Sequence, residues 1–127
     1  MVLLDTCALL ELCKSSNDQS FSLKKRDVLN QGVVVLSVSF AELACKIKAK
    51  KLKLGIAVNE IYHFCLSLSG FEIVDIGVSA WLDSIEMTWA ENQDPADRVI
   101  VSYAMKNRLA IVTTDQKMKA YYQRVIW

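Results

Sequence analysis

The sequence predicts an α/β fold in which a mainly parallel central sheet carries helices on both faces. Short apolar segments alternate along the chain with longer segments of helical periodicity. The short segments are apolar on both faces, which is typical of strands buried between two helical layers. No repeat, linker or low-complexity stretch divides the 127 residues, so a single domain over 1–127 is expected.

The chain begins with a predicted strand and two predicted helices. VLLD at 2–5 is a short, continuous apolar run, which is typical of a buried strand. Leucines recur at helical spacing in TCALLELCK at 6–14, so a helix is expected there. The polar run SSNDQS at 15–20 indicates a loop. A second helix over 21–31 should end before Gly32, because glycine is favoured just past helix ends.

The middle of the chain repeats this alternation. VVVLSV at 33–38 is continuous and β-branched, as a central strand is. Helical periodicity returns at 39–53 and again at 56–69, where Gly70 follows the expected helix end. FEIVDI at 71–76 is the third predicted strand.

The last third of the chain adds three predicted helices and two strands. VSAWLDSIEMTWAEN at 78–92 is predicted to be helical. The helix predicted at 94–108 begins with an aspartate cap and a proline in its first turn. LAIVTT at 109–114 is a predicted strand, 115–123 a short helix, and RVIW at 124–127 an edge strand.

Composition and charge exclude several classes of protein. Hydrophobic residues make up 53% of the chain and charged residues 23%, which indicates an ordered globular protein. The formal net charge is only +1, so any contact with RNA must come from local basic patches. No signal peptide and no apolar stretch of ~20 residues is visible. A cytoplasmic protein without a membrane partner is therefore expected.

Cysteine usage argues against a zinc site. No two of the four cysteines have C-x-x-C spacing, and the chain has a single histidine. Free thiols in a reducing cytosol are the simpler interpretation.

Four acidic residues are predicted to meet at one edge of the sheet. Asp5 and Asp115 each end a predicted strand, and Glu42 lies one turn into the helix after the second strand. Ligands of open α/β sheets bind outside the carboxyl ends of the strands, so these three carboxylates should project toward the same place. Asp97, one turn into the helix capped by Asp94, is the fourth candidate, although no strand directly precedes it.

This acidic set points to a metal-dependent reaction. Neighbouring carboxylates repel each other and cannot all stay ionised without a counter-charge. Mg²⁺ prefers oxygen ligands and keeps several waters. Such a cation lowers the pKa of a bound water and stabilises charge on a phosphoryl oxygen. The sequence therefore indicates hydrolysis of a phosphodiester bond.

Each acid also has a structural interpretation. Ser39 and Glu42 have the spacing of a capping box, in which the glutamate reaches back to the helix N-terminus. Asp94 and Asp97 have the same spacing, and Asp115 could cap the last helix. The arrival of four acids at one edge favours the metal site over four independent caps.

Several segments resemble the motifs of the PIN-domain family, and in particular VapC-type toxins of type II toxin–antitoxin pairs. They are VLLDT at 2–6, SFAELACKIKAKKL at 39–52, DPADRVIVSYAMKNRLAIVTTDQKM at 94–118 and the closing VIW. The resemblance implies an Mg²⁺- or Mn²⁺-dependent endoribonuclease that works through a metal-activated water. It further implies a homodimer and a cognate antitoxin that blocks the site.

The resemblance also implies roles for individual residues. The four catalytic and metal-binding acids would be Asp5, Glu42, Asp97 and Asp115. Three residues within the same motifs would support them, namely Thr6, Thr113 and Asp94.

Basic residues near the acids are candidate RNA contacts. Lysines gather at positions 46, 48, 50, 51 and 53. They fit phosphate contact and a solvated helix face equally well. Lys46, Lys50 and Arg98 are the residues that we carry forward as candidate contacts, and Arg98 could equally pair with an acid.

One segment departs from the family pattern and one alternative function stays open. Relatives often carry a histidine just before the DPxDR motif, where this chain has Glu91-Asn92-Gln93, so no ligand role is carried over to that segment. The alternative is a non-catalytic PIN-fold module that binds RNA or protein. The complete acid set favours the nuclease, because a site without catalysis has no use for four repelling carboxylates.

Overall fold

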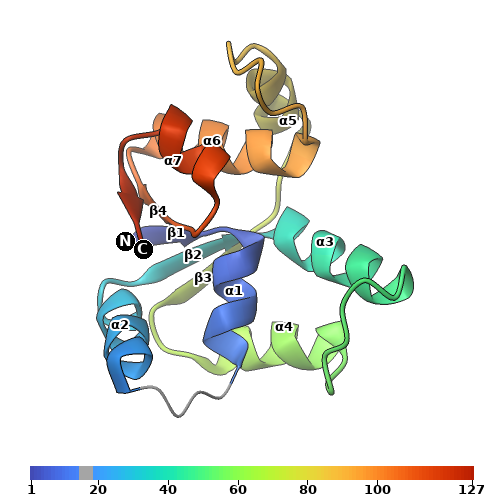
Figure 1. The fold of residues 1–127 in the computed structure, drawn as a ribbon, viewed down its shortest axis with the longest axis vertical. Helices are drawn as coiled ribbons and strands as arrows, with labels where there is room; N and C mark the ends of the chain where they lie inside the picture. Colours follow the sequence, from blue (N-terminus) through green and yellow to red (C-terminus); the bar gives the residue numbers. More distant parts are fainter. Residues whose placement is uncertain (15–18) are drawn as a thin grey trace.

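The computed structural model describes residues 1–14 and 19–127, with the sheet at the centre of the molecule (Figure 1). Within these ranges it contains five strands and seven helices. In chain order they are β1 (Val2–Leu4), α1 (Thr6–Cys13), α2 (Gln19–Asn30), β2 (Val33–Leu36), α3 (Ser37–Lys48), α4 (Val58–Ser67), β3 (Phe71–Val74), α5 (Val78–Ile85), α6 (Pro95–Asn107), β4 (Ala110–Val112), α7 (Gln116–Tyr121) and β5 (Val125–Ile126). Positions 15–18 of the loop predicted at 15–20 lie outside the described residues, and α2 begins two residues earlier than predicted.

All five strands are parallel, in the order β3-β2-β1-β4-β5. The central strand is β1, where Leu3 pairs with Val34 of β2 on one side and Ile111 of β4 on the other. The predicted parallel sheet is therefore confirmed. The closing segment forms β5 at the edge of the sheet, as predicted.

Side chains alternate between two buried cores because successive residues of a strand point to opposite faces. Leu4 faces the core under α1, α2, α3 and α4, whereas Leu3 faces the core under α6 and α7. Figure 1 shows these two helical layers on opposite sides of the sheet, with α5 beside α6. Strands buried on both faces explain why the strand segments read as unbroken apolar runs.

Two predicted boundaries are wrong around α3. The strand predicted at 33–38 ends at Leu36, and α3 already begins at Ser37, whose Oγ accepts a hydrogen bond from the backbone N–H of Ile76 (3.2 Å). The helix predicted at 39–53 ends at Lys48. Lys50 has a left-handed conformation (φ 58°), which turns the chain back toward α1 and makes the next residues part of a groove described below.

A third boundary is wrong after α5. The helix predicted at 78–92 ends at Ile85. Beyond it, the carbonyls of Met87, Trp89 and Asn92 accept hydrogen bonds from the Arg98 guanidinium (2.6–2.9 Å) instead of continuing a helix. None of the helices in the described ranges is long and apolar enough to cross a membrane.

Candidate active site

The four predicted acids line one cavity of ≈170 Å³ at the carboxyl edge of the sheet. This acidic cavity is lined by Asp5, Thr6, Cys7, Glu42, Lys46, Asp94, Asp97 and Asp115. It lies where the chain order reverses, since β1 has β2 on one side and β4 on the other. Open parallel sheets bind ligands at this point, because the connections leave in opposite directions there.

Asp5 is the most buried of the four acids, at 3% exposure. It caps α1, and its Oδ1 accepts the backbone N–H of Ala8 (2.7 Å). Its Oδ2 accepts a hydrogen bond from the Thr113 hydroxyl. Thr113 Oγ1 also accepts the backbone N–H of Asp115 (2.9 Å). Thr113 therefore ties Asp5 to Asp115 across the neighbouring strands β1 and β4.

Asp115 combines a helix cap with a place in the cavity. Its Oδ1 accepts the backbone N–H of Met118 (2.9 Å) and so caps α7. Its Oδ2 accepts no hydrogen bond from the described residues and remains available to a ligand. The cap and the metal interpretation of Asp115 are therefore compatible, because each uses a different oxygen.

Glu42 is not part of a capping box, and this structural interpretation of the sequence was wrong. Because α3 begins at Ser37, Glu42 lies in its second turn, and the helix has Leu36 at its N-cap without a side-chain bond. Glu42 Oε1 instead accepts a hydrogen bond from the Thr6 hydroxyl (2.5 Å), which also lies 3.1 Å from Oγ of the buried Ser39. Thr6 thereby holds Glu42 at the cavity.

Asp94 caps α6, as predicted, by accepting the backbone N–H groups of Ala96 (2.9 Å) and Asp97 (3.2 Å). The Asp97 carboxylate does not return to the helix N-terminus. Asn92 takes that place, because its Oδ1 accepts the N–H of Asp94 (2.9 Å). The side chain of Asp97 is thus free to face the cavity.

Asn92 is the residue whose role the sequence did not reveal. It is buried, and its Nδ2 donates to Asp97 Oδ2 (2.9 Å). The sequence did contain a sign of this role: Asn92 stands two residues before the helix cap Asp94, and asparagine side chains often accept the backbone N–H two positions later. Asn92 therefore positions Asp97, which has no strand directly before it.

The candidate basic contacts separate into two groups. Lys46 lines the acidic cavity, and no ion pair within the described residues joins it to an acid. Arg98 and Lys50 do not line the cavity. The guanidinium of Arg98 is occupied by three main-chain carbonyls and thereby holds the segment that carries Asn92.

The acids raise one another's affinity for protons. Burial raises the pKa of Asp5, and the charges of Asp115 and Glu42 raise it further, against hydrogen bonds that lower it. Burial likewise raises the pKa of Asp97 to about 6, with Asp94, Glu42 and Asp115 adding to the shift. The lysine at the cavity does not neutralise this set, so a cation bound there would relieve the repulsion.

The donor chemistry of the cavity fits a hard divalent cation such as Mg²⁺ or Mn²⁺. Its candidate ligands are carboxylate oxygens, and burial together with the charge of Asp5 raises the pKa of the Cys7 thiol, which stays protonated at neutral pH. Among the described residues, no three acidic, histidine or cysteine side chains lie close enough together to hold one ion directly. Retained waters, which Mg²⁺ commonly keeps, or side-chain rotation would complete the coordination.

The Asp97 carboxyl should contribute stability to the metal-free protein that grows as the pH falls from about 7 to about 4. The pKa of Asp97 is higher in the folded protein than its ordinary value of 3.8, so the folded state binds more protons in this range. We expect Asp97→Asn to remove about 1 kcal/mol of this pH-dependent gain, once solvent screening of a half-exposed group is allowed for. Urea unfolding in chelator at several pH values measures it. An equal pH slope in both proteins would contradict the prediction.

Comparison with known proteins identifies the family. Residues 2–123 match the family model of the PIN domain. The chain therefore belongs to the PIN-domain family, as its motifs indicated. PIN domains are generally nucleases and typically use divalent metals.

Three solved structures share this fold over nearly the whole chain. A toxin–antitoxin complex from Klebsiella pneumoniae has 19% identity and a TM-score of 0.67, with 100% of this chain and 97% of that chain covered. FitAB bound to the IR36 DNA fragment has 17% identity and a TM-score of 0.69, with 99% and 94% covered. FitAcB from Neisseria gonorrhoeae has 19% identity and a TM-score of 0.61, with 100% and 97% covered. No curated protein matches significantly.

Proposed function

We propose that this protein is an Mg²⁺- or Mn²⁺-dependent endoribonuclease. The observation that carries the proposal is the convergence of Asp5, Glu42, Asp97 and Asp115 on one cavity, although they lie far apart in the sequence. Membership of a nuclease family and an all-oxygen donor set support the same conclusion. The alternative, a non-catalytic binding module, explains the helix caps at Asp5 and Asp115 but gives no reason for Glu42 and Asp97 to line the same cavity.

Each residue of the site would have a distinct role in the proposed reaction. The metal, when bound by the four acids, would supply Lewis-acid stabilisation and an activated water. Thr113 and Thr6 orient Asp5 and Glu42, and Asn92 orients Asp97. Lys46 at the cavity wall would bind a phosphate oxygen of the substrate and hold the scissile bond near the acids.

We further propose that the protein is the toxin of a toxin–antitoxin pair. Two of the similar folds belong to a toxin–antitoxin complex and to the FitAB complex, which supports a protein partner for this chain. The cognate antitoxin would cover the acidic cavity, and the active protein would be a homodimer in the cytoplasm. A neighbouring small reading frame and co-purification of its product would test the pairing.

Metal removal is the direct test of the proposed reaction. We expect the purified protein to cleave single-stranded RNA in Mg²⁺ or Mn²⁺ and to stop when EDTA is added. The proposed reaction needs the metal-activated water, and burial raises the pKa of Cys7, the thiol at the cavity, so that it is a poor substitute nucleophile. Gel analysis of a labelled RNA measures the loss of cleavage in EDTA and its recovery when the metal is restored in excess. Cleavage that continues unchanged in EDTA would refute the proposed mechanism.

A further inference from the structure

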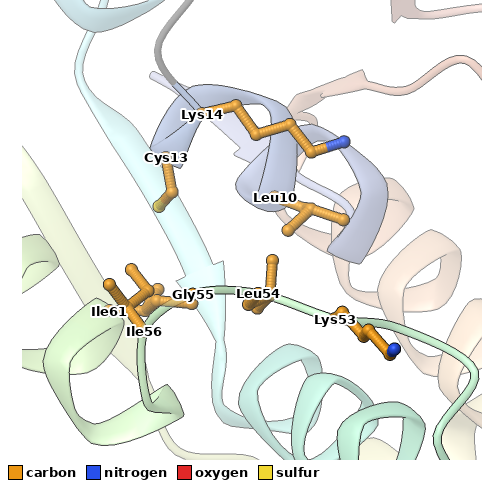
Figure 2. A pocket seen from close by; sticks show the side chains of 8 residues that line it. All are labelled: Leu10, Cys13, Lys14, Lys53, Leu54, Gly55, Ile56 and Ile61. Atoms are coloured by element: carbon orange, nitrogen blue, oxygen red, sulfur yellow. The ribbon is translucent and has the colours of Figure 1, made fainter.

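Two further cavities lie along α1, and the nearer of them adjoins the acidic cavity. The middle cavity (≈250 Å³) lies between α1 and the end of α3 and shares Thr6, Cys7 and Lys46 with the acidic cavity. The outer cavity (≈370 Å³) shares Leu10 with the middle one and lies between α1 and residues 53–56 (Figure 2). The shared lining residues make the three cavities successive neighbours along α1.

The sign of the charge changes along this series. Carboxylates dominate the acidic cavity, whereas every charged side chain that lines the other two is a lysine. The middle cavity has Lys46 and Lys51, and the outer one has Lys14 and Lys53. Lys14 is paired with Glu11 (3.1 Å), but no ion pair within the described residues engages Lys51 or Lys53. These two cavities therefore favour an anionic ligand.

The floor of both cavities is apolar. Leu43 and Leu52 line the middle cavity, and Leu54, Ile56 and Ile61 line the outer one. Figure 2 shows leucine side chains from α1 and from the 53–56 segment facing each other across the outer cavity, with lysines at its margin. An apolar floor with a cationic margin suits a ligand with exposed flat faces and a charged backbone.

Single-stranded nucleic acid has this character. Its bases can be splayed out onto a surface while its phosphates stay at the margin, whereas a duplex keeps its bases stacked inside. The stacked bases of a duplex cannot reach a floor recessed between α1 and the 51–56 segment. The two cavities therefore suit one strand and not two.

We propose that one arm of a single-stranded RNA substrate leaves the acidic cavity along α1, with its phosphates at Lys46, Lys51 and Lys53 and its bases over the leucine floor. The inference rests on the proposed nuclease function and adds the direction of the substrate to it. Because the middle cavity shares Thr6, Cys7 and Lys46 with the acidic cavity and leads away from it along α1, contacts along α1 would serve the nucleotides on one side of the cleaved bond. Lys48 and Lys50, although close in sequence, line neither cavity.

The test compares Lys51→Gln/Lys53→Gln with the wild type. Both lysines are exposed, so the fold should be kept, and thermal melts verify this. Binding of a fluorescent single-stranded RNA is measured by anisotropy in Ca²⁺ at several salt concentrations. We expect the double variant to bind about tenfold more weakly at low salt, with a salt slope about 1.4 smaller, since each phosphate contact on a single strand contributes about 0.7. Lys51→Arg/Lys53→Arg should keep the wild-type slope.

A second measurement addresses the direction of the strand. RNAs extended on either side of the mapped cleavage position are compared by kcat/KM in Mn²⁺. We expect extension on one side only to raise kcat/KM of the wild type, and the double lysine-to-glutamine variant to lose this gain. Lys24→Gln, at an exposed position of α2 that lines none of the three cavities, should keep it.

The outcomes separate this inference from the proposed function. A wild-type protein that neither binds nor cleaves RNA refutes the nuclease itself. Wild-type cleavage together with an unchanged affinity and salt slope in the double glutamine variant overturns the strand path and leaves the two cavities to a protein partner. An equal gain from extensions on both sides also overturns the single direction.

Discussion

Asp5→Asn should lower RNA cleavage by about three orders of magnitude and leave the fold intact. Loss of a metal ligand removes several kcal/mol of transition-state stabilisation, and each 1.4 kcal/mol is about tenfold in rate. Asparagine still offers an oxygen to the N–H of Ala8, so the cap of α1 is kept. The Thr113 hydroxyl, which now donates to Asp5, can accept a hydrogen bond from the new amide.

The loss of activity in Asp5→Asn should also be visible in living cells. Expression of the wild type is expected to arrest growth of a bacterial host, and Asp5→Asn should relieve the arrest at an equal protein level. Asp27→Asn, an exposed acid on α2, is the matched control and should remain toxic. If the Asp5→Asn protein accumulates equally and is as toxic and as active as the wild type, Asp5 is not a metal ligand.

Glu42→Gln should lower cleavage by about two orders of magnitude through weaker metal binding. Glutamine can still accept the hydrogen bond of the Thr6 hydroxyl, so the side chain should stay in place. The change removes one negative charge from the cavity and relieves repulsion of Asp5 and Asp97. The stability of the metal-free protein should therefore change by less than about 1 kcal/mol.

Metal binding provides the second readout for Glu42. Mg²⁺ stabilises the folded wild type in proportion to the occupancy of its site, so the rise in melting temperature on adding Mg²⁺ should shrink in Glu42→Gln. Glu60→Gln on α4, an exposed glutamate in a helix, keeps the cavity unchanged and should show the full rise. Wild-type activity with an undiminished Mg²⁺ shift would leave Glu42 outside the metal site.

Local patterns were sufficient to predict most of the architecture. The apolar runs around Leu3 and Val34 are typical of strands covered on both faces, and parallel strands place their carboxyl ends together. For this reason the convergence of Asp5, Glu42 and Asp115 could be predicted from residues far apart in sequence. The helix caps at Asp94 and Asp115 were equally visible, because capping depends on a few neighbouring residues.

Boundaries and partners that depend on distant contacts could not be predicted. The segment after α5 reads as helix by periodicity, but Arg98, from the next helix, binds its carbonyls and draws it into a loop. That loop carries Asn92, whose bond to Asp97 could not be inferred without it. Periodicity likewise predicted that α3 continues beyond Lys48, but the left-handed turn at Lys50 ends the helix there.

The sequence by itself determined the fold class, through hydrophobic periodicity, and the family, through the resemblance of its motifs. It also indicated Asp5 and Asp115 as candidate site residues, because each follows a predicted strand. Only the tertiary structure decided what each neighbouring polar residue does. It assigned Thr6 to Glu42 and separated Lys46 and Lys51 from Lys48 and Lys50. The physical reason is that periodicity defines the faces of a helix, whereas the partner of each face depends on packing against elements distant in the chain.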